Sequence, residues 1–217
     1  LGQRGRLSLE DSIGKYFASA PPDKRGITLA HLMSGGSGLP DFHDRSGEDW
    51  DPDLAWIDRA TAVGRILAQP LLFAPGQGNE HSHSAYGLLA AVIEIVSGRS
   101  YRDFLREEIF APVGMQRTGF FGETLGLRVE EFATGYGASS VGLPNIPPNW
   151  GPTSWLVMGS GGMFSTLGDM ERYYAALESG RLLTGTWAAR QQGETVDAGG
   201  SDRGFFIFRV SDGRGTQ

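Results

Sequence analysis

The chain has 217 residues, of which 40% are hydrophobic and 11% aromatic, enough for one globular domain of generous size. Its net charge is −6 and its 19 basic residues are scattered, which argues against a nucleic-acid partner. With no cysteine and no apolar run near the roughly 20 residues of a membrane span, it excludes disulfides, cysteine nucleophiles and a transmembrane segment.

The first chemical motif along the chain is Ser12-x-x-Lys15. In one class of serine hydrolases this spacing sets a nucleophilic hydroxyl one helical turn from the lysine that helps activate it. However, Ser12 follows two acids, Glu10 and Asp11, at the expected first turn of a helix, whereas a nucleophile's helix should be buried and apolar. We therefore interpret the motif as a solvated coincidence.

Helices are predicted from capping residues and from apolar side chains at helical spacing. They span residues 29–33, 51–69, 84–98, 100–115 and 167–180. We assign helix caps to Thr28, Ser84, Ser100 and Thr166, and we expect Pro112 to end the fourth helix. Residues 119–163 are rich in Gly and Pro and are interpreted as loops and short strands, while FFIFRV at 205–210 is a strand candidate.

Four segments, in order, carry a resemblance to a known family. They are RGRLSLEDSIGKYF (4–17), ITLAHLMSGGSGLPDF (27–42), the long stretch from FAPGQGNEHSHSAYGLL to PVGMQRTGF (73–120), and GSGGMFSTLGDMERYYAALESGRLL (159–183). They resemble the serine β-lactamase and penicillin-binding-protein superfamily, most closely its class C β-lactamase and family VIII esterase branch. The resemblance implies an α+β, β-lactamase/transpeptidase-like fold: an antiparallel sheet flanked by helices, with a largely helical lobe that this chain mostly represents.

The same resemblance places the family's nucleophile outside this chain. The family Ser-x-x-Lys lies upstream of the segment that holds Ser12, so we expect it before Leu1, and we expect the Lys-Thr-Gly or His-x-Gly strand after Gln217. We therefore expect residues 1–217 to form a single domain that is incomplete at both ends. The compartment stays open, periplasmic or secreted if a leader was removed and otherwise cytoplasmic, and so does the oligomeric state.

The remaining family motif is Tyr-x-Asn, which falls on His81-Ser82-His83 when Tyr86 is aligned with the following family aromatic. The family tyrosine takes part in proton transfer and the asparagine contacts substrate. By resemblance, His81 is then a catalytic residue and His83 a substrate-binding residue. An imidazole is a usual general base near neutral pH, so this replacement is chemically tolerable.

Other departures and features are less informative. Gly35 stands where the family usually has histidine, and Gly161 and Gly162 are expected to border the cleft. Trp150 and Trp155 are candidates for a substrate pocket or for core packing.

Two further readings of the histidine pair stay open. The histidines can be ordinary loop residues of a homologue that has lost activity. They can also form a metal site, because His-x-His in extended chain points both imidazoles to one side, and His43 with Asp41 and Asp44 can complete it. The spacing Asp49-x-Asp51-x-Asp53 lacks the Gly and the Glu of a calcium loop, so we reject a calcium site there.

The resemblance implies a serine hydrolase that acts through an acyl-enzyme on an ester, amide or β-lactam, without metal or cofactor. Its partner is then a small acyl substrate or a peptide. The alternative is a non-catalytic homologue that binds a peptide or cell-wall fragment in the same cleft.

Overall fold

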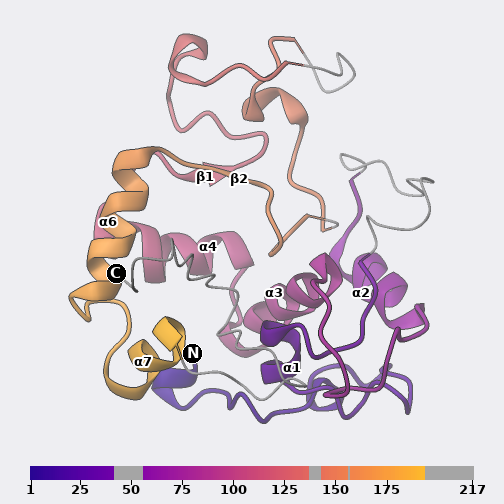
Figure 1. Ribbon diagram of the computed structural model, residues 1–217. Helices are drawn as coiled ribbons and strands as arrows, with labels where there is room; N and C mark the ends of the chain where they lie inside the picture. The colour runs from indigo at the N-terminus through magenta and orange to yellow at the C-terminus, as the bar shows by residue number, and fades with distance from the viewer. Residues whose placement is uncertain (42–55, 137–142, 156, 194–217) are drawn as a thin grey trace, which may run out of the picture.

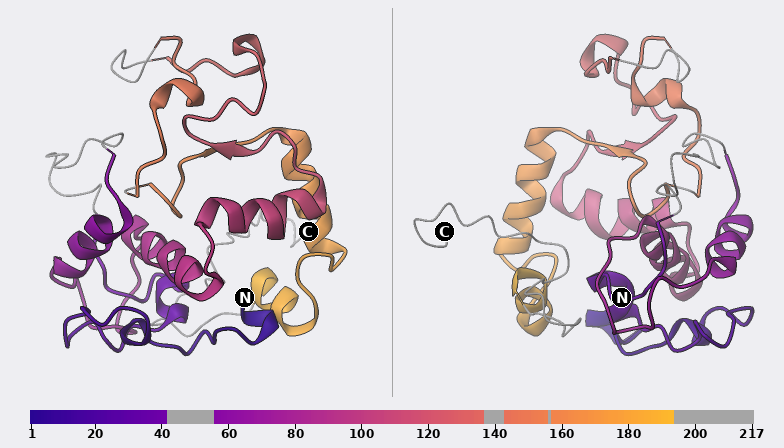
Figure 2. Two further views of the ribbon diagram at one scale, coloured as in Figure 1. Left: turned by 180° about the vertical axis from the view of Figure 1, so that it is seen from behind. Right: turned by 45° about the vertical axis from the view of Figure 1, so that its right-hand side comes forward.

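The computed structural model describes residues 1–41, 56–136, 143–155 and 157–193 (Figure 1). Among the described residues, the first half of the chain holds short 3-10 turns and helices. These are η1 (Gly2–Arg4), η2 (Ile13–Lys15), α1 (Leu29–Ser34), α2 (Arg59–Ala68) and α3 (His83–Ser97). Helix α3 packs against α1 and α2, and the views in Figure 2 keep the three helices together.

The second half of the chain contains a small two-stranded sheet and further helices. Its elements are α4 (Tyr101–Leu105), the π-helical turn η3 (Arg106–Phe110), α5 (Ala111–Val113), β1 (Gly119–Phe120), η4 (Val129–Glu131), η6 (Pro147–Trp150), β2 (Met163–Phe164), α6 (Leu167–Glu178) and α7 (Gly185–Gly193). Strands β1 and β2 pair antiparallel, with Gly119 opposite Phe164 and Phe120 opposite Met163. Helices with a small antiparallel sheet confirm the α+β class. The described part of residues 119–163 consists of loops, 3-10 turns and the two short strands, as interpreted from the sequence.

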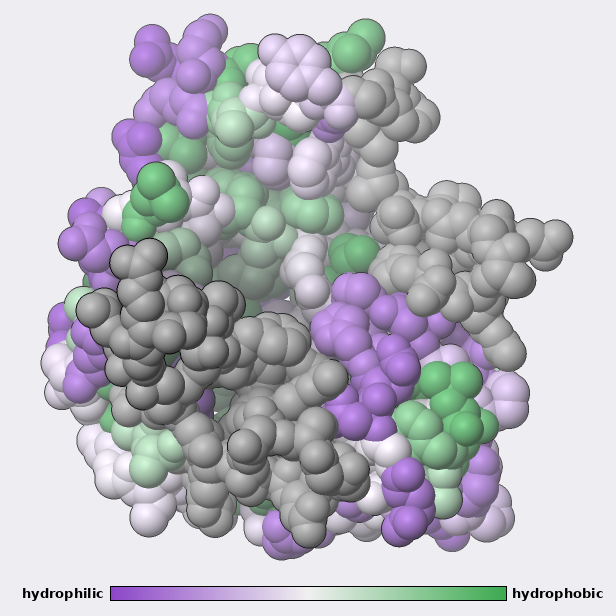
Figure 3. Space-filling model, in the orientation of Figure 1, coloured by the Kyte–Doolittle hydropathy of each residue, from purple (hydrophilic) through white to green (hydrophobic). Residues whose placement is uncertain are grey.

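Buried apolar side chains of the described residues form two core clusters. The first core cluster joins α1, α2 and α3 to the N-terminal segment through residues such as Ile13, Leu32 and Leu88. The second core cluster surrounds Phe120 between α4, α5 and α6. Trp155 packs against both clusters, so its role is core packing. On the face shown in Figure 3, hydrophobic side chains gather in the recessed middle.

Most of the expected helix caps are confirmed. The side chains of Thr28, Ser100 and Thr166 each accept a hydrogen bond from a backbone N–H in the first turn. The cap of α3 is Ser82 rather than Ser84, because the Ser82 hydroxyl accepts from the backbone of Ala85. His83 is therefore the first helical residue of α3.

Two predicted helix boundaries were wrong. Helix α2 begins at Arg59, because Asp58 caps it through the backbone N–H of Thr61. The fourth helix passes through Pro112 and ends at Gly114, whose φ of 78° lies in the left-handed region that favours glycine. Proline is tolerated there because it sits in the first turn of α5, after the π-helical turn.

A buried carboxylate fixes the start of α6. Asp169 is 1% exposed, and its Oδ2 accepts hydrogen bonds from the backbone N–H of Arg117 at 2.7 Å and from the Thr118 hydroxyl at 2.8 Å. Its Oδ1 accepts from Arg172 at 3.0 Å. The network ties α6 to the segment before β1.

Within the part of the chain that the structure describes, no helix has the length and apolarity to cross a bilayer.

Candidate active site

The histidine pair lies where an extended residue leads into α3. Ser82, between them, has φ −144° and ψ 112°, so its neighbours project to the opposite side of the chain. The Ser82 side chain is 1% exposed and its hydroxyl donates to the carbonyl oxygen of Pro40 at 3.3 Å. His81 is accordingly exposed and His83 half-exposed. The sequence pattern thus anchors one residue and presents two imidazoles.

The loop beneath this segment depends on glycine at two positions. Gly38 has φ 72°, and a Cβ there would lie 2.1 Å from the carbonyl oxygen of Phe73. A Cβ on Gly35 would lie 3.0 Å from the carbonyl of Glu80 and close to the Asn79 side chain. The residues that lead to the histidines therefore run directly over this loop, and Asn79 fills the space at Gly35.

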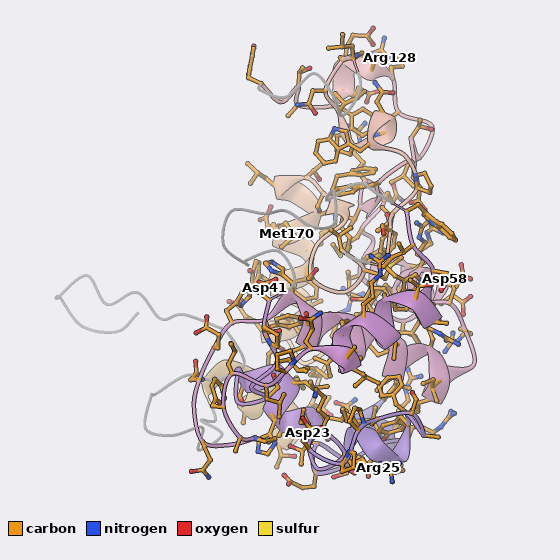
Figure 4. The ribbon with its side chains drawn as sticks, turned by 90° about the vertical axis from the view of Figure 1, so that its right-hand side faces the viewer. Asp23, Arg25, Asp41, Asp58, Arg128 and Met170 are labelled. Carbon is orange, nitrogen blue, oxygen red and sulfur yellow. The ribbon has the colours of Figure 1, made fainter. Side chains whose placement is uncertain are left out.

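Asp41 ends that loop and meets His83 from 42 positions away in the sequence. Its Oδ2 contacts Nδ1 of the His83 ring and accepts a hydrogen bond from the His83 backbone N–H at 3.5 Å. A carboxylate on Nδ1 holds the proton there and leaves Nε2 as the acceptor of the ring. Figure 4 shows Asp41 at mid-height, above Asp23 and Arg25 and below Arg128.

His81 completes the group. Its ring stands edge-on to the His83 ring, with centroids 4.9 Å apart and an interplanar angle of 87°. The Tyr86 ring lies 6.0 Å from His81, and burial raises the pKa of Tyr86 well above its ordinary value. Tyr86 therefore stays protonated near neutral pH, so an imidazole is a better proton acceptor at this point than the neighbouring phenol.

One donor atom from each of Asp41, His81 and His83 lies within 4.8 Å of the other two. The structure thus brings Asp41 to the pair, as one of the open readings of the sequence requires. The other residues named in that reading, His43 and Asp44, and the residues Asp49, Asp51 and Asp53 lie outside the described residues, as does the strand candidate at 205–210.

The loop of residues 158–162 approaches α3 at Gly159, two residues before the first of the expected cleft glycines. A Cβ on Gly159 would lie 2.4 Å from the carbonyl oxygen of Tyr86, so this loop packs directly on α3. The carbonyl of Gly162 accepts from the backbone of Phe121 at 3.0 Å and from the Thr153 hydroxyl at 3.3 Å. The loop thus contacts the backbone of Tyr86, and the expectation that Gly161 and Gly162 border a cleft stays a prediction.

The Ser12-x-x-Lys15 motif has a different environment. Lys15 is paired with Asp11 at 2.8 Å, and hydrogen bonds from Lys15 and Tyr16 lower the pKa of Asp11 to about 2. Ser12 precedes η2 and makes no capping hydrogen bond through its side chain. The ammonium group is therefore held by a carboxylate.

Sequence reasoning did not find the contact between Asp41 and His83 as a positioning interaction. Asp41 follows Ser37-Gly38-Leu39-Pro40, a loop pattern that predicts a turn but not what lies beside it. The signal that could have found it is the loop's place in the second resembling segment, which contributes to the same region as the Tyr-x-Asn motif.

Comparison with known proteins gives a consistent result. The model of the β-lactamase family matches residues 1–215. Penicillin-binding protein 4* of Bacillus subtilis (strain 168) is 33% identical over 139 residues, 63% of this chain and 30% of that protein. The D-alanyl-D-alanine-carboxypeptidase/endopeptidase AmpH of Escherichia coli (strain K12) is 31% identical over 180 residues, 78% of this chain and 42% of that protein. The chain thus spans less than half the length of either relative.

Among solved structures, the D-amino acid amidase from Ochrobactrum anthropi SV3 complexed with L-phenylalanine matches with a TM-score of 0.70 at 28% identity. The match covers 88% of this chain and 53% of the amidase. The similarity therefore extends over most of the described elements.

Proposed function

The chain belongs to the β-lactamase family and has its β-lactamase/transpeptidase-like fold, and from that premise we propose that it is part of a serine hydrolase acting through an acyl-enzyme. The observation that supports the proposal is that His81 lies just before α3 and His83 is its first residue. By resemblance, we assign the two histidines to the Tyr-x-Asn positions. In the proposal, a serine elsewhere in the protein attacks an acyl carbonyl, and water then releases the acid.

His81 takes the part of the proton acceptor in this proposal. It is the more exposed of the two imidazoles and stands beside a tyrosine that burial keeps protonated. A neutral imidazole accepts the proton of the attacking hydroxyl and returns it to the leaving group.

His83 takes the part of a substrate contact. The Asp41 carboxylate fixes its ring through Nδ1, so that Nε2 has a defined place and can accept a hydrogen bond from an amide N–H of the substrate. Asp41 is a positioning residue in this arrangement, because it acts through His83. Gly161 and Gly162 complete the proposed binding site as part of the cleft border.

The substrate class that the relatives support is an amide next to a D-amino acid. One relative is named a D-alanyl-D-alanine-carboxypeptidase/endopeptidase and one neighbour a D-amino acid amidase. We propose that this protein hydrolyses the same kind of bond, with esters and β-lactams as the other acyl substrates to compare. The class C and esterase branch of the family stays part of the proposal.

The test uses the full-length protein and a fluorophosphonate probe, followed by turnover of a D-alanyl-D-alanine peptide, D-phenylalaninamide, a nitrophenyl ester and a chromogenic cephalosporin. We expect labelling of one serine and turnover of the amides. His81→Ala should lower kcat by about 100-fold, the usual scale for a lost general base. His83→Ala should mainly raise KM.

His31→Gln is the matched control. It removes an imidazole from the first turn of α1, where glutamine also suits the capping box with Thr28. Its turnover should equal that of the wild type. A His81→Ala protein of normal rate would show that His81 is not the base.

A second candidate is a non-catalytic homologue that binds a peptide or cell-wall fragment. The replacement of both the family tyrosine and the family asparagine by histidine favours it. A wild-type protein that the probe does not label, but that binds a D-alanyl-D-alanine peptide, would support this candidate against the hydrolase.

A further inference from the structure

We propose that Asp41, His81 and His83 bind a divalent first-row transition-metal ion, for which Zn²⁺ is the test ion. The inference rests on the side chains themselves and holds whether or not the protein is a hydrolase. It concerns the same three residues, so metal occupancy and the proton-acceptor role of His81 exclude each other.

The backbone builds this site for a specific reason. Ser82 is extended and anchored inward by its hydrogen bond to Pro40, which turns the flanking imidazoles to the same outer side. The same hydrogen bond draws the end of the 35–41 loop to α3 and places the Asp41 carboxylate against His83. One anchored residue thus assembles two ring nitrogens and one carboxylate.

The spacing suits a metal ion after small side-chain movements. The three donor atoms lie within 4.8 Å of one another. Ligands about 2.0–2.1 Å from a tetrahedral zinc ion are about 3.3 Å apart. The widest pair of donors must therefore close by no more than about 1.5 Å, and Asp41 and His83, which are already in contact, must separate. The His81 ring is exposed and can rotate, and the Asp41 carboxylate can turn from His83 to share the ion.

The donor set selects the class of metal. Two imidazoles and one carboxylate suit zinc and neighbouring transition metals, whereas magnesium and calcium prefer oxygen ligands alone. The side chain of Asp41 is 13% exposed, and its negative charge offsets the partial positive charge at the start of α3. Three protein ligands leave a fourth position open for water or a substrate atom.

The consequence for the proposed function is inhibition. An imidazole whose lone pair binds a metal ion has no acceptor left for a proton. A protein loaded with Zn²⁺ should therefore turn over its acyl substrate more slowly than the metal-free protein. This consequence depends on the proposed function, but the binding does not.

The experiment is calorimetric titration of the tag-free, chelator-treated full-length protein with ZnCl₂, and optical titration with CoCl₂. We expect one Zn²⁺ per chain and a cobalt absorption spectrum typical of low coordination number. Separate His81→Ala and His83→Ala substitutions should each weaken binding by at least about 100-fold, beyond the usual effect of losing an outer-shell partner. Asp41→Asn, which keeps the side-chain size, should weaken it by about 10-fold or more.

His31→Gln is again the control, and it should bind Zn²⁺ as the wild type does. A wild type that binds no tighter than the His81→Ala/His83→Ala double variant would overturn the inference. So would an equal loss of binding in His31→Gln. Because binding is read without turnover, a failed titration leaves the hydrolase proposal intact, and an inactive protein that binds zinc leaves this inference intact.

Discussion

Helices α3 and α6 both begin at a hydroxyl-bearing cap with a carboxylate beside it, but they differ in what the carboxylate does. At α6, Thr166 caps the helix and the Asp169 carboxylate is buried among protein donors. At α3, Ser82 caps the helix and Asp41 arrives from a distant loop to meet the ring of His83, which keeps 34% of its side chain exposed.

The difference separates a structural polar group from one available for chemistry. The Asp169 carboxylate has protein partners at both oxygens, so it holds α6 in place and offers nothing to a ligand. Asp41 orients a ring that keeps 34% of its side chain exposed. A carboxylate of the first kind should affect stability alone, and one of the second kind should affect substrate binding.

The largest expected effect is on the α6 side of this comparison. Asp169→Ala removes the acceptor of the Arg117 backbone N–H and one partner of the buried Thr118 hydroxyl, which keeps its contact with Ser165. Because the unpaired groups are neutral donors and Arg172 is exposed, the free energy of unfolding should fall by about 2 kcal/mol, measured by urea unfolding. Glu171→Ala, at an exposed position of the same helix, should change it by about 0.5 kcal/mol or less.

If Asp169→Ala does not fold, Asp169→Asn keeps an acceptor for one donor and should fold with intermediate stability. Turnover per folded molecule should be unchanged in both variants. A lower turnover at full stability would place Asp169 on the chemical side of the comparison.

On the α3 side, Asp41→Asn should act on binding. The amide keeps the size of the side chain but loses the charge that holds the proton on Nδ1 of His83. We expect KM for the acyl substrate to rise about 10-fold, equivalent to about 1.4 kcal/mol, with kcat little changed. Steady-state kinetics measure both.

Asp58→Asn is the matched control, because asparagine caps a helix as well as aspartate does. Figure 4 shows Asp58, at the start of α2, away from Asp41. Its KM should equal that of the wild type. An Asp41→Asn protein with normal KM and a lower melting temperature would make Asp41 another structural carboxylate.

The sequence predicts the cap residue of α6 but not that of α3. Thr166 and Asp169 are three residues apart, so local spacing predicts the cap of α6 correctly. At α3 the spacing led to Ser84, a buried hydroxyl with no hydrogen-bond partner among the described residues, instead of Ser82. Both serines precede an apolar run, and only the tertiary contact with Pro40 decides between them.

The contact between His83 and Asp41 could not be predicted from local sequence either, because it too depends on tertiary structure. Asp41 and His83 are joined only when the 35–41 loop folds onto the segment before α3, where Gly38 permits close approach to Phe73. No periodicity encodes that approach. In contrast, the sequence does predict that both histidine rings lie on one side, because a single extended residue between them is enough for this arrangement.

A smaller effect on stability is expected at Glu108, a partly exposed carboxylate that two arginines bind. Hydrogen bonds from Arg4 and Arg99 lower the pKa of Glu108 to about 2, below its ordinary value of 4.5. Its contribution to stability is therefore full above about pH 4.5 and is lost as the pH falls toward about 2. Glu108→Gln should lower the free energy of unfolding by at most about 1 kcal/mol at pH 7, and the difference should vanish near pH 2.

Urea unfolding of wild type and Glu108→Gln at a series of pH values measures this difference, with Glu171→Gln on α6 as the control. Turnover at pH 7 should be the same in all three proteins. A difference that grows on acidification would have the wrong sign for a carboxylate whose pKa is lowered by folding.

The smallest expected effect concerns the Ser12-x-x-Lys15 motif, which has the spacing of a catalytic pair but the environment of a structural one. The Lys15 ammonium is bound by Asp11 at 2.8 Å, and the Ser12 side chain makes no capping hydrogen bond. The ammonium group of Lys15 is thus engaged with Asp11. Ser12→Ala should therefore change the free energy of unfolding by about 0.5 kcal/mol or less and leave probe labelling of the full-length protein intact. If Ser12→Ala instead abolished labelling while the melting temperature held, Ser12 would be the nucleophile and the alignment that sets it aside would be wrong.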